Sequence, residues 1–287
     1  MKNYVLIGGA GYVAPKHYHA IKETGGNLLA ILDPHDSVGI LDSYFPNCKY
    51  FSEFEVFDRF CATQFIDYVV VCSPNYLHDA HSRFGLRIGA DVICEKPLVL
   101  NERNLDGLCE MEEKTGHRIW NILQLRFVST SLEDYREVKK YAPVSLEYYT
   151  PRGCWYEYSW KGDIAKSGGL VTNIGVHLFD MLLWLFGPKY QVLRWENKKD
   201  LSSGIINIGE HSCSIILSIE MNYPKLRSLL IGEDSIDLSD RFDDLHLMSY
   251  EKILRGEGFG IEDVRPAIGL CEELGGTSHL KIGRNGR

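Results

Sequence analysis

The stretch Tyr4-Val-Leu-Ile-Gly8-Gly-Ala-Gly11-Tyr-Val-Ala14 joins an apolar run directly to a glycine-rich turn and a helical segment. Within it, Gly9, Gly11 and Ala14 fit the pattern G-x-G-x-x-A, which gains its meaning from this strand–turn–helix context. The first glycine permits a tight turn, the second lets a pyrophosphate approach the backbone, and the small third residue packs the helix on the sheet. Because a helix N-terminus presents free N–H groups to an anion, the stretch predicts a dinucleotide site.

A carboxylate follows the next predicted strand. The run Leu28–Leu32 ends in Asp33-Pro34, 22 residues after Gly11. A carboxylate at that place accepts hydrogen bonds from the adenosine ribose hydroxyls and repels a 2′-phosphate, so NAD is expected rather than NADP. The alternative is a glycine turn in a flavodoxin-like fold that binds no NAD, and the presence of both elements weighs against it.

The first 120 residues alternate short apolar runs with helical stretches, and the strands are continuous and β-branched. This pattern is typical of parallel strands that are covered on both faces and joined by right-handed crossovers. The prediction is an α/β fold whose N-terminal domain is a doubly wound parallel sheet of the Rossmann type. The expected strands are 4–7, 28–32, 67–72, 91–94 and 118–123, and the expected helices are 14–23, 76–88 and 102–115.

The pattern changes after residue 123, where strand-like runs follow one another without helices between them. Such succession favours a large, mostly antiparallel, open sheet. We therefore expect an NAD-binding Rossmann domain over residues 1–121 and an α/β domain for substrate binding and oligomerisation over residues 122–287, with the final helix able to pack back on the first domain. The expected strands here are 145–150, 191–196, 204–208, 212–221, 228–231 and 235–238, and the expected helices are 131–141, 174–186, 243–254 and 265–274.

The composition excludes several classes of protein. At 287 residues the chain is long enough for two domains, and its formal charge of 31 − 39 = −8 does not favour a general nucleic-acid binder. None of the eight cysteines forms a CxxC pair and no signal-peptide pattern precedes the first strand, so a reduced, cytoplasmic protein is expected. No run reaches the ~18 apolar residues of a membrane span, so no membrane association is expected.

A lysine follows the predicted strand Asp91–Cys94, in the sequence Glu95-Lys96-Pro97. Ligands of open α/β sheets bind beyond the carboxyl ends of the strands, which places Lys96 at the mouth of the cofactor cleft. An ammonium group there can hydrogen-bond a hydroxyl that is being oxidised and stabilise its alkoxide character. The alternative for Lys96 is an ordinary surface lysine in a turn.

A polar stripe crosses the apolar helix expected at residues 174–186. At 100° per residue, Asn173, His177, Asp180 and Trp184 fall within about 60° of one another. Polar side chains on a buried helix are costly unless they are paired or line a cavity. Because histidine has an unperturbed pKa of about 6.5, His177 suits a base near neutral pH, whereas a satisfied core histidine is the alternative. The spacing also permits a metal pair of His177 with Asp180, but without a third ligand no metal is expected.

These motifs together resemble the glucose–fructose oxidoreductase/inositol dehydrogenase/rhizopine catabolism (Gfo/Idh/MocA) family along nearly the whole chain. The resemblance implies NAD(P)-linked oxidation or reduction of a sugar or cyclitol carbon, with Lys96 and His177 as the catalytic pair. Many members carry Asp where this chain has Asn173, so no proton relay through that carboxylate is expected here, and Asn173 is left to orient the substrate or Lys96. The motifs that carry the resemblance are 9–17, 73–78, 95–97, 168–169 and 175–180.

Four shorter stretches, 121–126, 152–156, 160–163 and 172–177, are similar to one subgroup, the bacterial UDP-N-acetyl-2-amino-2-deoxyglucuronate 3-dehydrogenases. This similarity implies NAD-dependent oxidation of the sugar 3-hydroxyl of a UDP-N-acetyl-hexosaminuronate to a 3-keto sugar, in amino-sugar biosynthesis for a surface polysaccharide such as O-antigen or lipopolysaccharide. It also implies 2-oxoglutarate as a means of recycling the cofactor and a downstream PLP aminotransferase in the pathway. The strand-rich second half and the habit of the family imply a homotetramer, or a dimer, through that sheet.

Other functions stay open at this stage. A UDP-N-acetylglucosamine 3-dehydrogenase keeps the chemistry and removes the carboxylate, and a free sugar or inositol dehydrogenase changes the substrate further. A non-catalytic NAD-binding sensor or scaffold is the alternative outside enzymes, and it predicts tight NAD binding without reduction of the cofactor by any sugar nucleotide.

The expected site divides into two sets of residues. For the cofactor they are Gly9, Ala10, Gly11, Tyr12, Val13, Asp33, Ser73, Pro74, Asn75, His78, Glu95, Lys96, Gln124 and Trp160. For the substrate they are Lys96, Arg126, Arg152, Lys161, Asn173 and His177. The arginines and Lys161 suit a carboxylate or a diphosphate, because a guanidinium pairs with either in bidentate fashion. The neighbouring aromatics, Trp155, Tyr156, Tyr158 and Trp160, cover a sugar or nicotinamide face, or belong to the core or a subunit contact.

Overall fold

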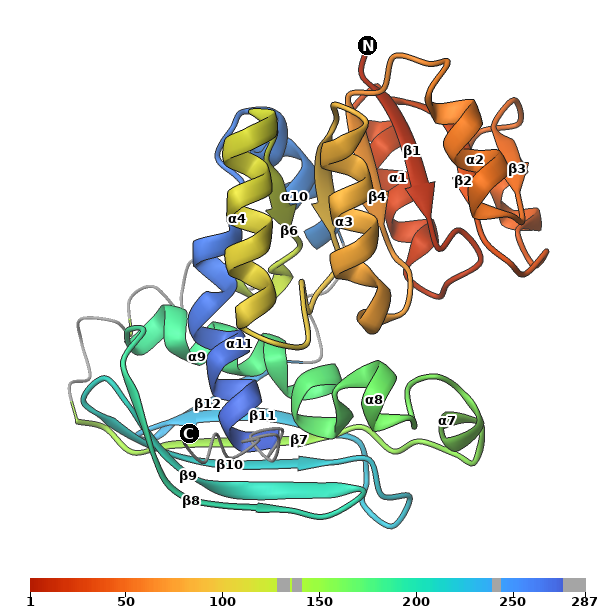
Figure 1. Ribbon diagram of the computed structural model, residues 1–287. Coiled ribbons are helices and arrows are strands. Elements are labelled where there is room, and N and C mark those ends of the chain that lie inside the picture. Colours follow the sequence, from red (N-terminus) through yellow and green to blue (C-terminus); the bar gives the residue numbers. More distant parts are fainter. Residues whose placement is uncertain (128–134, 136–140, 239–243, 276–287) are drawn as a thin grey trace, which may run out of the picture. The chain divides into compact units, whose positions relative to one another are not determined.

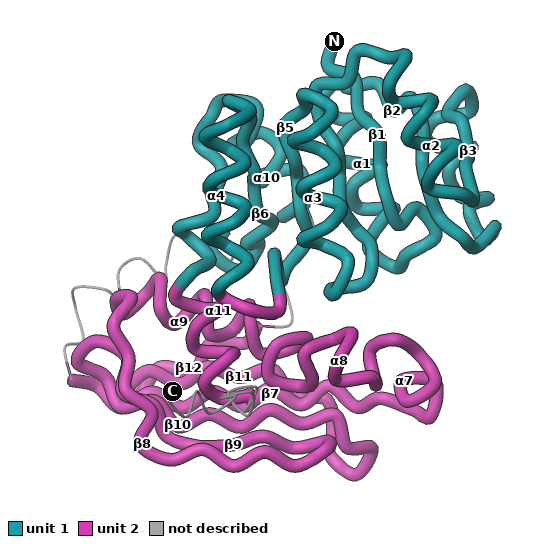
Figure 2. Tube along the Cα trace, viewed as in Figure 1, with its two compact units in different colours: residues 1–99, 103–130, 241–265 teal, residues 100–102, 131–240, 266–287 magenta. Residues whose placement is uncertain are grey.

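The computed structural model describes residues 1–127, 135, 141–238 and 244–275 (Figure 1). The chain divides into two compact units (Figure 2). Unit 1 holds residues 1–99, 103–130 and 241–265, and unit 2 holds residues 100–102, 131–240 and 266–287. The sequence suggested one boundary after residue 121 and a return of the final helix only. In the structure the segment that returns to unit 1 is 241–265, which lies before most of that helix.

Unit 1 is built on a six-stranded sheet in the order β3-β2-β1-β4-β5-β6, and every pairing in it is parallel. This order is that of a doubly wound Rossmann sheet, so the predicted fold class of the first half is confirmed. The central strands are buried throughout, as the β-branched runs predicted. The strands are β1 Asn3–Ile7, β2 Asn27–Leu32, β3 Lys49–Phe51, β4 Tyr68–Val71, β5 Asp91–Cys94 and β6 Ile119–Asn121.

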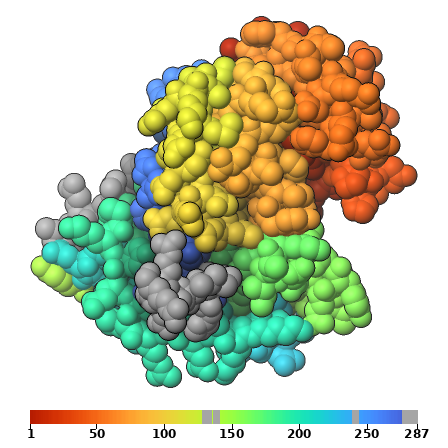
Figure 3. Space-filling model, in the orientation of Figure 1, coloured from red at the N-terminus to blue at the C-terminus, as the bar shows by residue number. Residues whose placement is uncertain are grey.

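Helices cover both faces of this sheet. On one face α1 (Ala14–Glu23) packs beside α10 (Leu245–Leu254), and their apolar side chains join a core with alternate strand residues such as Tyr4 and Val70. The opposite face carries α2 (Phe54–Cys61), α3 (His78–Arg87) and α4 (Arg103–Thr115). Figures 1 and 3 show α3 and α4 side by side on the face turned to the viewer. The short 3-10 turns are Gly39–Ser43, Asn75–Leu77 and Gln124–Phe127.

Unit 2 is built on a second six-stranded sheet, in the order β12-β11-β7-β10-β9-β8. Its pairings are antiparallel except for β7 with β10, which run parallel, so the sheet is mostly antiparallel as predicted. The alternating burial along β7 and β10 leaves one face in the core and the other partly exposed. The strands are β7 Val144–Tyr149, β8 Tyr190–Asn197, β9 Leu201–Ile208, β10 His211–Ser218, β11 Leu226–Ile231 and β12 Asp234–Asp237.

The buried face of this sheet is covered by a helical stretch that contains a π-helix. The π-helix, η4 (Val171–Gly175), continues directly into α9 (Val176–Phe186). A Cβ atom at Gly175 would lie 2.6 Å from the Phe179 ring and 2.9 Å from Leu217 of β10, so only glycine lets the helix approach the sheet this closely. The remaining helices are α7 (Trp155–Tyr158), α8 (Ile164–Ser167) and α11 (Ile261–Gly275), which begins in unit 1 and ends in unit 2.

Residues 164–186 form one helical stretch that is long and apolar enough, by length and composition, to cross a membrane. No such stretch was expected from the sequence. Within unit 2, however, 72% of its most apolar window is buried, which is the situation of a core helix packed on a sheet.

Some expected elements differ from the structure. The predicted strands and helices of both halves are present within a few residues of their bounds, but β3 and α2 were not predicted from the sequence pattern. The helix expected over residues 131–141 lies mostly outside the described residues.

Candidate active site

The glycine-rich turn and Asp33 meet at the carboxyl ends of β1 and β2. The N–H of Ala10 donates to Asp33 Oδ2 at 2.9 Å, and the N–H of His35 donates to Asp33 Oδ1 at 2.9 Å. The turn is closed by the N–H of Gly11, which donates to the carbonyl of Gly8 at 3.1 Å. The carboxylate that the sequence assigned to the ribose therefore also fixes the turn that was assigned to the pyrophosphate.

Two positions of this turn lie so close to other backbone atoms that they require glycine. Gly8 has a φ of +95°, and a Cβ there would lie 2.5 Å from the backbone of Cys72. A Cβ at Gly11 would lie 3.1 Å from the carbonyl oxygen of Gly8. Helix α1 begins at Ala14 without a side-chain cap, and Val13 precedes it in αR geometry. The N–H of Ala14 donates to the Gly11 carbonyl at 3.1 Å and that of Lys16 to the Val13 carbonyl at 3.0 Å. The turn residues Tyr12 and Val13, just before the helix, therefore have the N–H groups that suit an anion.

The ends of β4 and β5 are tied together by a buried histidine. The ring atoms of His78 lie 2.7 Å from the carbonyl oxygen of Pro97 and 2.7 Å from that of Ser73. Burial lowers the pKa of His78, while these two carbonyl contacts oppose the effect. Ser73 Oγ is in turn 2.8 Å from His81 Nδ1, and the predicted residue Asn75 is buried beside them. The structure therefore brings the motifs 73–78 and 95–97 together at the ends of β4 and β5.

Two further predicted residues lie on the 3-10 turn after β6. The Oε1 atom of Gln124 is buried without a hydrogen-bond partner among the described residues. Arg126, which was assigned to the substrate, donates to Asp263 Oδ1 at 3.3 Å and to the Asp263 carbonyl at 2.9 Å, and its guanidinium stacks on the Phe259 ring. The described contacts of Arg126 thus fix a returning segment of unit 1, whereas Gln124 offers an acceptor to a ligand.

In unit 2, the polar stripe lies on η4 and α9. Asn173, His177 and Trp184 are partly exposed between buried neighbours, while Asp180 is buried. The π-helix holds Asn173 and ends two residues before His177, and such single π turns are frequent at functional sites. Asn173 Nδ2 donates to the hydroxyl of Tyr156 at 2.9 Å, and burial raises the pKa of Tyr156.

Two cations gather beside these residues in unit 2. Burial lowers the pKa of Lys161, and the nearby positive charge of Arg152 lowers it further. Lys161 Nζ lies 5.7 Å and 5.6 Å from the centres of the Trp155 and Trp160 rings. Within the described part of the chain, neither Arg152 nor Lys161 forms an ion pair with a carboxylate. Two like charges without a carboxylate partner repel each other, and a bound anion would relieve that repulsion, so this cluster is suited to an anion.

Unit 1 also contains a cluster of three side chains that the sequence did not predict as a group. His17, Glu95 and His246 lie together within 4.8 Å of one another, and they are the described group with the spacing of a metal site. Glu95 was assigned to the cofactor, but its described side-chain contacts are with these two histidines. No local pattern links His246 to Glu95, because 151 residues separate them.

The family comparison gives two matches. The model for the Gfo/Idh/MocA oxidoreductase family, NAD-binding Rossmann fold, matches residues 2–122. The model for the C-terminal alpha/beta domain of the same oxidoreductase family matches residues 140–205. The two matches lie in the regions of the parallel sheet of unit 1 and of the mixed sheet of unit 2.

Solved structures similar to this chain include two complexes of the WlbA (WbpB) dehydrogenase from Thermus thermophilus. The complex with NAD and alpha-ketoglutarate is 40% identical, with a TM-score of 0.90 over 96% of this chain and 95% of that chain. The complex with NAD and UDP-GlcNAcA is 38% identical, with a TM-score of 0.89 over the same shares of 96% and 95%.

A curated relative is 2,7-anhydro-N-acetylneuraminate hydratase from Mediterraneibacter gnavus, 26% identical over 64% of this chain and 49% of its own length. The chain thus aligns with about half the length of this relative, and with 36% of the D-glucoside 3-dehydrogenase from Escherichia coli.

Proposed function

Because this chain belongs to the Gfo/Idh/MocA oxidoreductase family, we propose that it is an NAD-dependent dehydrogenase of a nucleotide sugar. The reaction is oxidation of the 3-hydroxyl of a UDP-N-acetyl-hexosaminuronate to a ketone. A protein 38% identical over nearly the whole chain has been crystallised with NAD and UDP-GlcNAcA. The observation that carries the substrate class is the cation pair of Arg152 and Lys161, which has no carboxylate partner among the described residues.

The residues present in unit 1 fit NAD. The uncapped N-terminus of α1 and the glycine turn from Gly9 through Val13 would hold the pyrophosphate, and Asp33 would accept from the ribose hydroxyls. The buried Oε1 of Gln124 is suited to the carboxamide N–H of the nicotinamide. When bound, NAD supplies the hydride acceptor. The other residues that the sequence assigns to the cofactor are, in unit 1, Ser73, Pro74, Asn75, His78, Glu95 and Lys96 and, in unit 2, Trp160.

Lys96 and His177 divide the chemistry of the hydroxyl. The Lys96 ammonium donates to the 3-oxygen and stabilises the negative charge that develops there as the C3 hydride leaves. The His177 ring accepts the hydroxyl proton, so that the products are a C3 carbonyl and a protonated histidine. Asn173 cannot take up a proton, and it holds the substrate through its amide while Tyr156 fixes that amide.

Arg152 and Lys161 are the stronger candidates for the uronate carboxylate. They lie in unit 2 with Asn173 and Tyr156, and the desolvation of Lys161 increases the free energy gained from an anion. The charge of Arg126 is already balanced by Asp263, so its part in substrate binding is the weaker one. A bidentate carboxylate would pair with Arg152, and the two tryptophan rings beside Lys161 would cover the sugar face.

A second substrate follows from the same cation pair. 2-Oxoglutarate is also a carboxylate, and the similar T. thermophilus dehydrogenase has been crystallised with NAD and alpha-ketoglutarate. We therefore propose that 2-oxoglutarate accepts the hydride and a proton to give 2-hydroxyglutarate, which restores NAD without release of the cofactor. The 3-keto sugar then suits a PLP aminotransferase, which would convert the ketone to an amine in a cytoplasmic route to surface polysaccharide.

The partly exposed face of the unit 2 sheet suits contact between copies of the chain. Strand register places Ile205, Ser214, Ser145 and Leu230 in one row across this face. Ile205 is 40% exposed and Leu230 is 37% exposed, and both are apolar side chains on a face that the core does not use. We propose a homotetramer through this face, and light scattering after gel filtration measures its mass.

The experiment that tests the proposed function uses the purified chain and UDP-GlcNAcA. Absorbance at 340 nm and the mass of the sugar nucleotide are followed with and without 2-oxoglutarate. Reduction of bound or added NAD with loss of two hydrogens from the sugar supports the proposal. Reduction by UDP-N-acetylglucosamine alone moves the protein to the neutral-sugar class, and silence with both leaves an NAD-binding family member without this reaction.

A further inference from the structure

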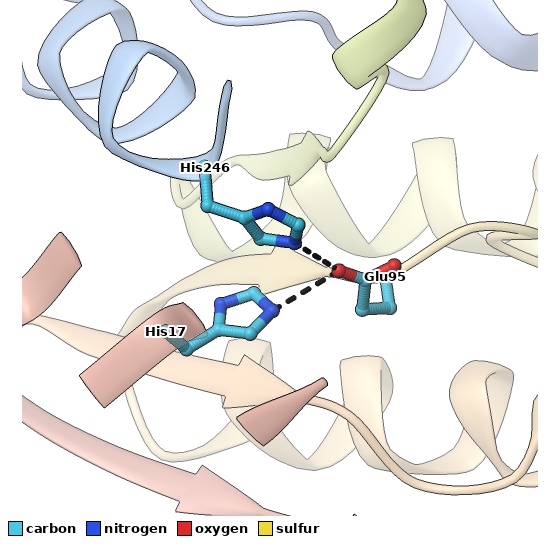
Figure 4. A group of neighbouring side chains, drawn as sticks. All are labelled: His17, Glu95 and His246. Carbon is cyan, nitrogen blue, oxygen red and sulfur yellow. Dashed lines mark hydrogen bonds and ion pairs between the residues drawn. The ribbon is translucent and has the colours of Figure 1, made fainter. Parts of the chain in front are cut away.

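A buried acid joins two histidines behind the end of β5 (Figure 4). Glu95 Oε1 lies 3.1 Å from His17 Nε2 and 2.8 Å from His246 Nε2. His17 comes from α1, Glu95 follows β5, and His246 comes from α10, so three segments far apart in the sequence converge on one oxygen atom. All three side chains are buried. We call this group the His–Glu–His trio.

The hydrogen bonds of the trio satisfy one another without a ligand. Each Nε2–H donates to Glu95 Oε1, and the hydroxyl of Tyr250 donates to His17 Nδ1 at 2.9 Å. The two rings also meet edge to face, with their centres 4.9 Å apart. A metal ion would have to break both histidine–carboxylate bonds, because both Nε2 atoms use the same oxygen. The geometry is therefore that of a hydrogen-bond network around a carboxylate.

The trio keeps a negative charge inside unit 1. Burial alone would raise the pKa of Glu95, but the hydrogen bonds and charges of His17 and His246 hold it well below its ordinary value. Burial lowers the pKa of His17, and the hydrogen bond with Glu95 opposes this effect. The other titratable groups that face the trio are Lys16 on α1, Tyr250 on α10, Cys72 after β4, Cys94 on β5 and His78 on α3.

The two residues that flank Lys96 in the chain, Glu95 and Pro97, are both held by hydrogen bonds of their backbone groups. The N–H of Glu95 donates to the Val71 carbonyl at 3.0 Å, which holds the residue before Lys96 to β4. The carbonyl of Pro97, the residue after Lys96, is bound by the His78 ring. Lys96 thus lies between two residues whose polar groups are buried and paired, so its backbone has little freedom.

We propose that His17 and His246 are positioning residues that hold the Glu95 carboxylate in place and, through it, set the position and charge of Lys96. The proposal rests on the catalytic role of Lys96 given above. Because His246 belongs to α10, the network makes the reactivity of Lys96 depend on a segment about 150 residues further along the chain.

The test compares His246→Leu with His246→Gln and Glu95→Gln in the full chain. Gln at position 246 can still donate from its amide nitrogen, whereas Leu cannot. We expect kcat to fall at least ~10-fold in His246→Leu and ~30-fold in Glu95→Gln, with the pH profile of kcat displaced. His246→Gln should recover activity to within about threefold, and KM for NAD should change by less than about threefold in all variants.

A second readout needs no substrate. Labelling by acetic anhydride across a pH series, read by peptide mass spectrometry, gives the apparent pKa of Lys96. Loss of the Glu95 charge should move the labelling curve of Lys96 towards lower pH, because a nearby opposite charge raises the pKa of an ammonium group. If no sugar nucleotide is oxidised but the labelling curve moves as stated, the proposed function fails and the positioning role stands.

The matched control is Ser249→Ala, which removes a buried hydrogen bond to Leu245 from the same helix without touching Glu95. It should lower the melting temperature and leave the pH profile and the labelling curve unchanged. The proposal is overturned if His246→Leu and Ser249→Ala behave alike, or if the Lys96 labelling curve is the same in Glu95→Gln and wild type. One equivalent of zinc in the purified chain, lost in Glu95→Gln, would also overturn it in favour of a metal site.

Discussion

On either side of Lys96 in unit 1, buried polar groups are paired with one another, whereas Arg152 and Lys161 in unit 2 lie together without a carboxylate partner among the described residues. The paired groups around Glu95 and His78 gain nothing from a ligand, and they hold the backbone on both sides of Lys96, the residue proposed to contact the reacting hydroxyl. The cations of unit 2 gain much from an anion, because desolvation and repulsion both disfavour them when no anion is bound. Paired polar groups therefore indicate preorganisation, and like charges indicate recognition.

The largest expected effect comes from removing the reactive groups themselves. Lys96→Met and His177→Asn should each lower kcat by at least ~10², the usual size of an acid–base contribution, while the affinity for NAD stays within threefold. Steady-state rates at 340 nm and fluorescence titration with NADH measure both quantities. The control is Lys22→Met, an exposed lysine on α1 whose contacts among the described residues are with the Ser43 carbonyl and the Tyr44 ring. Rates near wild type in both variants would remove Lys96 and His177 from the catalytic roles.

The next largest effect concerns the affinity for the substrate rather than the rate of the reaction. Arg152→Met should weaken binding of UDP-GlcNAcA by about 50-fold, because a charge-assisted bond to the carboxylate is lost. Binding of UDP-N-acetylglucosamine should change by less than threefold, and isothermal titration calorimetry compares the two ligands. Lys199→Met is the matched control, since Lys199 pairs with Glu157 on the surface. Equal losses for both ligands would assign Arg152 to the diphosphate instead of the uronate.

A third effect concerns the stability of unit 1 in acid. Burial lowers the pKa of His81 from 6.5 to about 4, and it also lowers the pKa values of His17 and His78. The unfolded chain therefore binds protons below pH 6.5 that the native chain refuses, so stability is complete above that pH and falls towards pH 4. From His81 alone, the free energy of unfolding should be about 2 kcal/mol lower at pH 5 than at pH 7.

Urea denaturation at the two pH values measures this difference, and hydrogen exchange assigns it to β4 and β5. His81→Asn should reduce the pH dependence, although Ser73 loses its partner. A flat profile between pH 7 and pH 5 would contradict a lowered pKa of His81.

The smallest effect concerns Asp33, which holds the glycine turn and is proposed to bind the ribose of the cofactor. Asp33→Ser should lower kcat/KM for NAD by about 10-fold and leave that for NADP unchanged or higher, because the repulsion of a 2′-phosphate is lost. It should also cost about 1 kcal/mol of stability through the lost bond from Ala10. Asp36→Ser, an exposed neighbour, is the control. An unchanged preference for NAD would place the discrimination elsewhere.

The sequence predicted the parts of the molecule whose cause is local. The glycine turn, Asp33 and the buried strands follow from spacing and hydrophobic pattern, and the structure brings the turn and Asp33 together. The stripe of Asn173 and His177 was also predicted from a local pattern. The π-helix that carries Asn173 was not predicted, because nothing in the composition of residues 171–175 distinguishes a π-helix from an α-helix.

What escaped prediction depends on contacts between distant residues. The pairing of Arg126 with Asp263, the parallel contact of β7 with β10 and the histidine pair on Glu95 each join segments separated by about 70 residues or more. A single sequence gives the chemistry of such side chains but not their partners. From the sequence, Arg126 and Arg152 were equally good candidates to bind the substrate carboxylate. In the structure, Arg126 is paired with Asp263.

The return of residues 241–265 to unit 1 has a consequence for the order of synthesis. When a ribosome has released the first 130 residues, α1 and β5 exist but α10 does not, so His17 and Glu95 lack His246 and Tyr250. The nucleotide-binding unit cannot mature from the amino end while the rest is still being made. A nascent chain arrested before α10 would expose apolar side chains of the unit 1 core and depend on chaperones. NAD would stabilise only chains that already include α10.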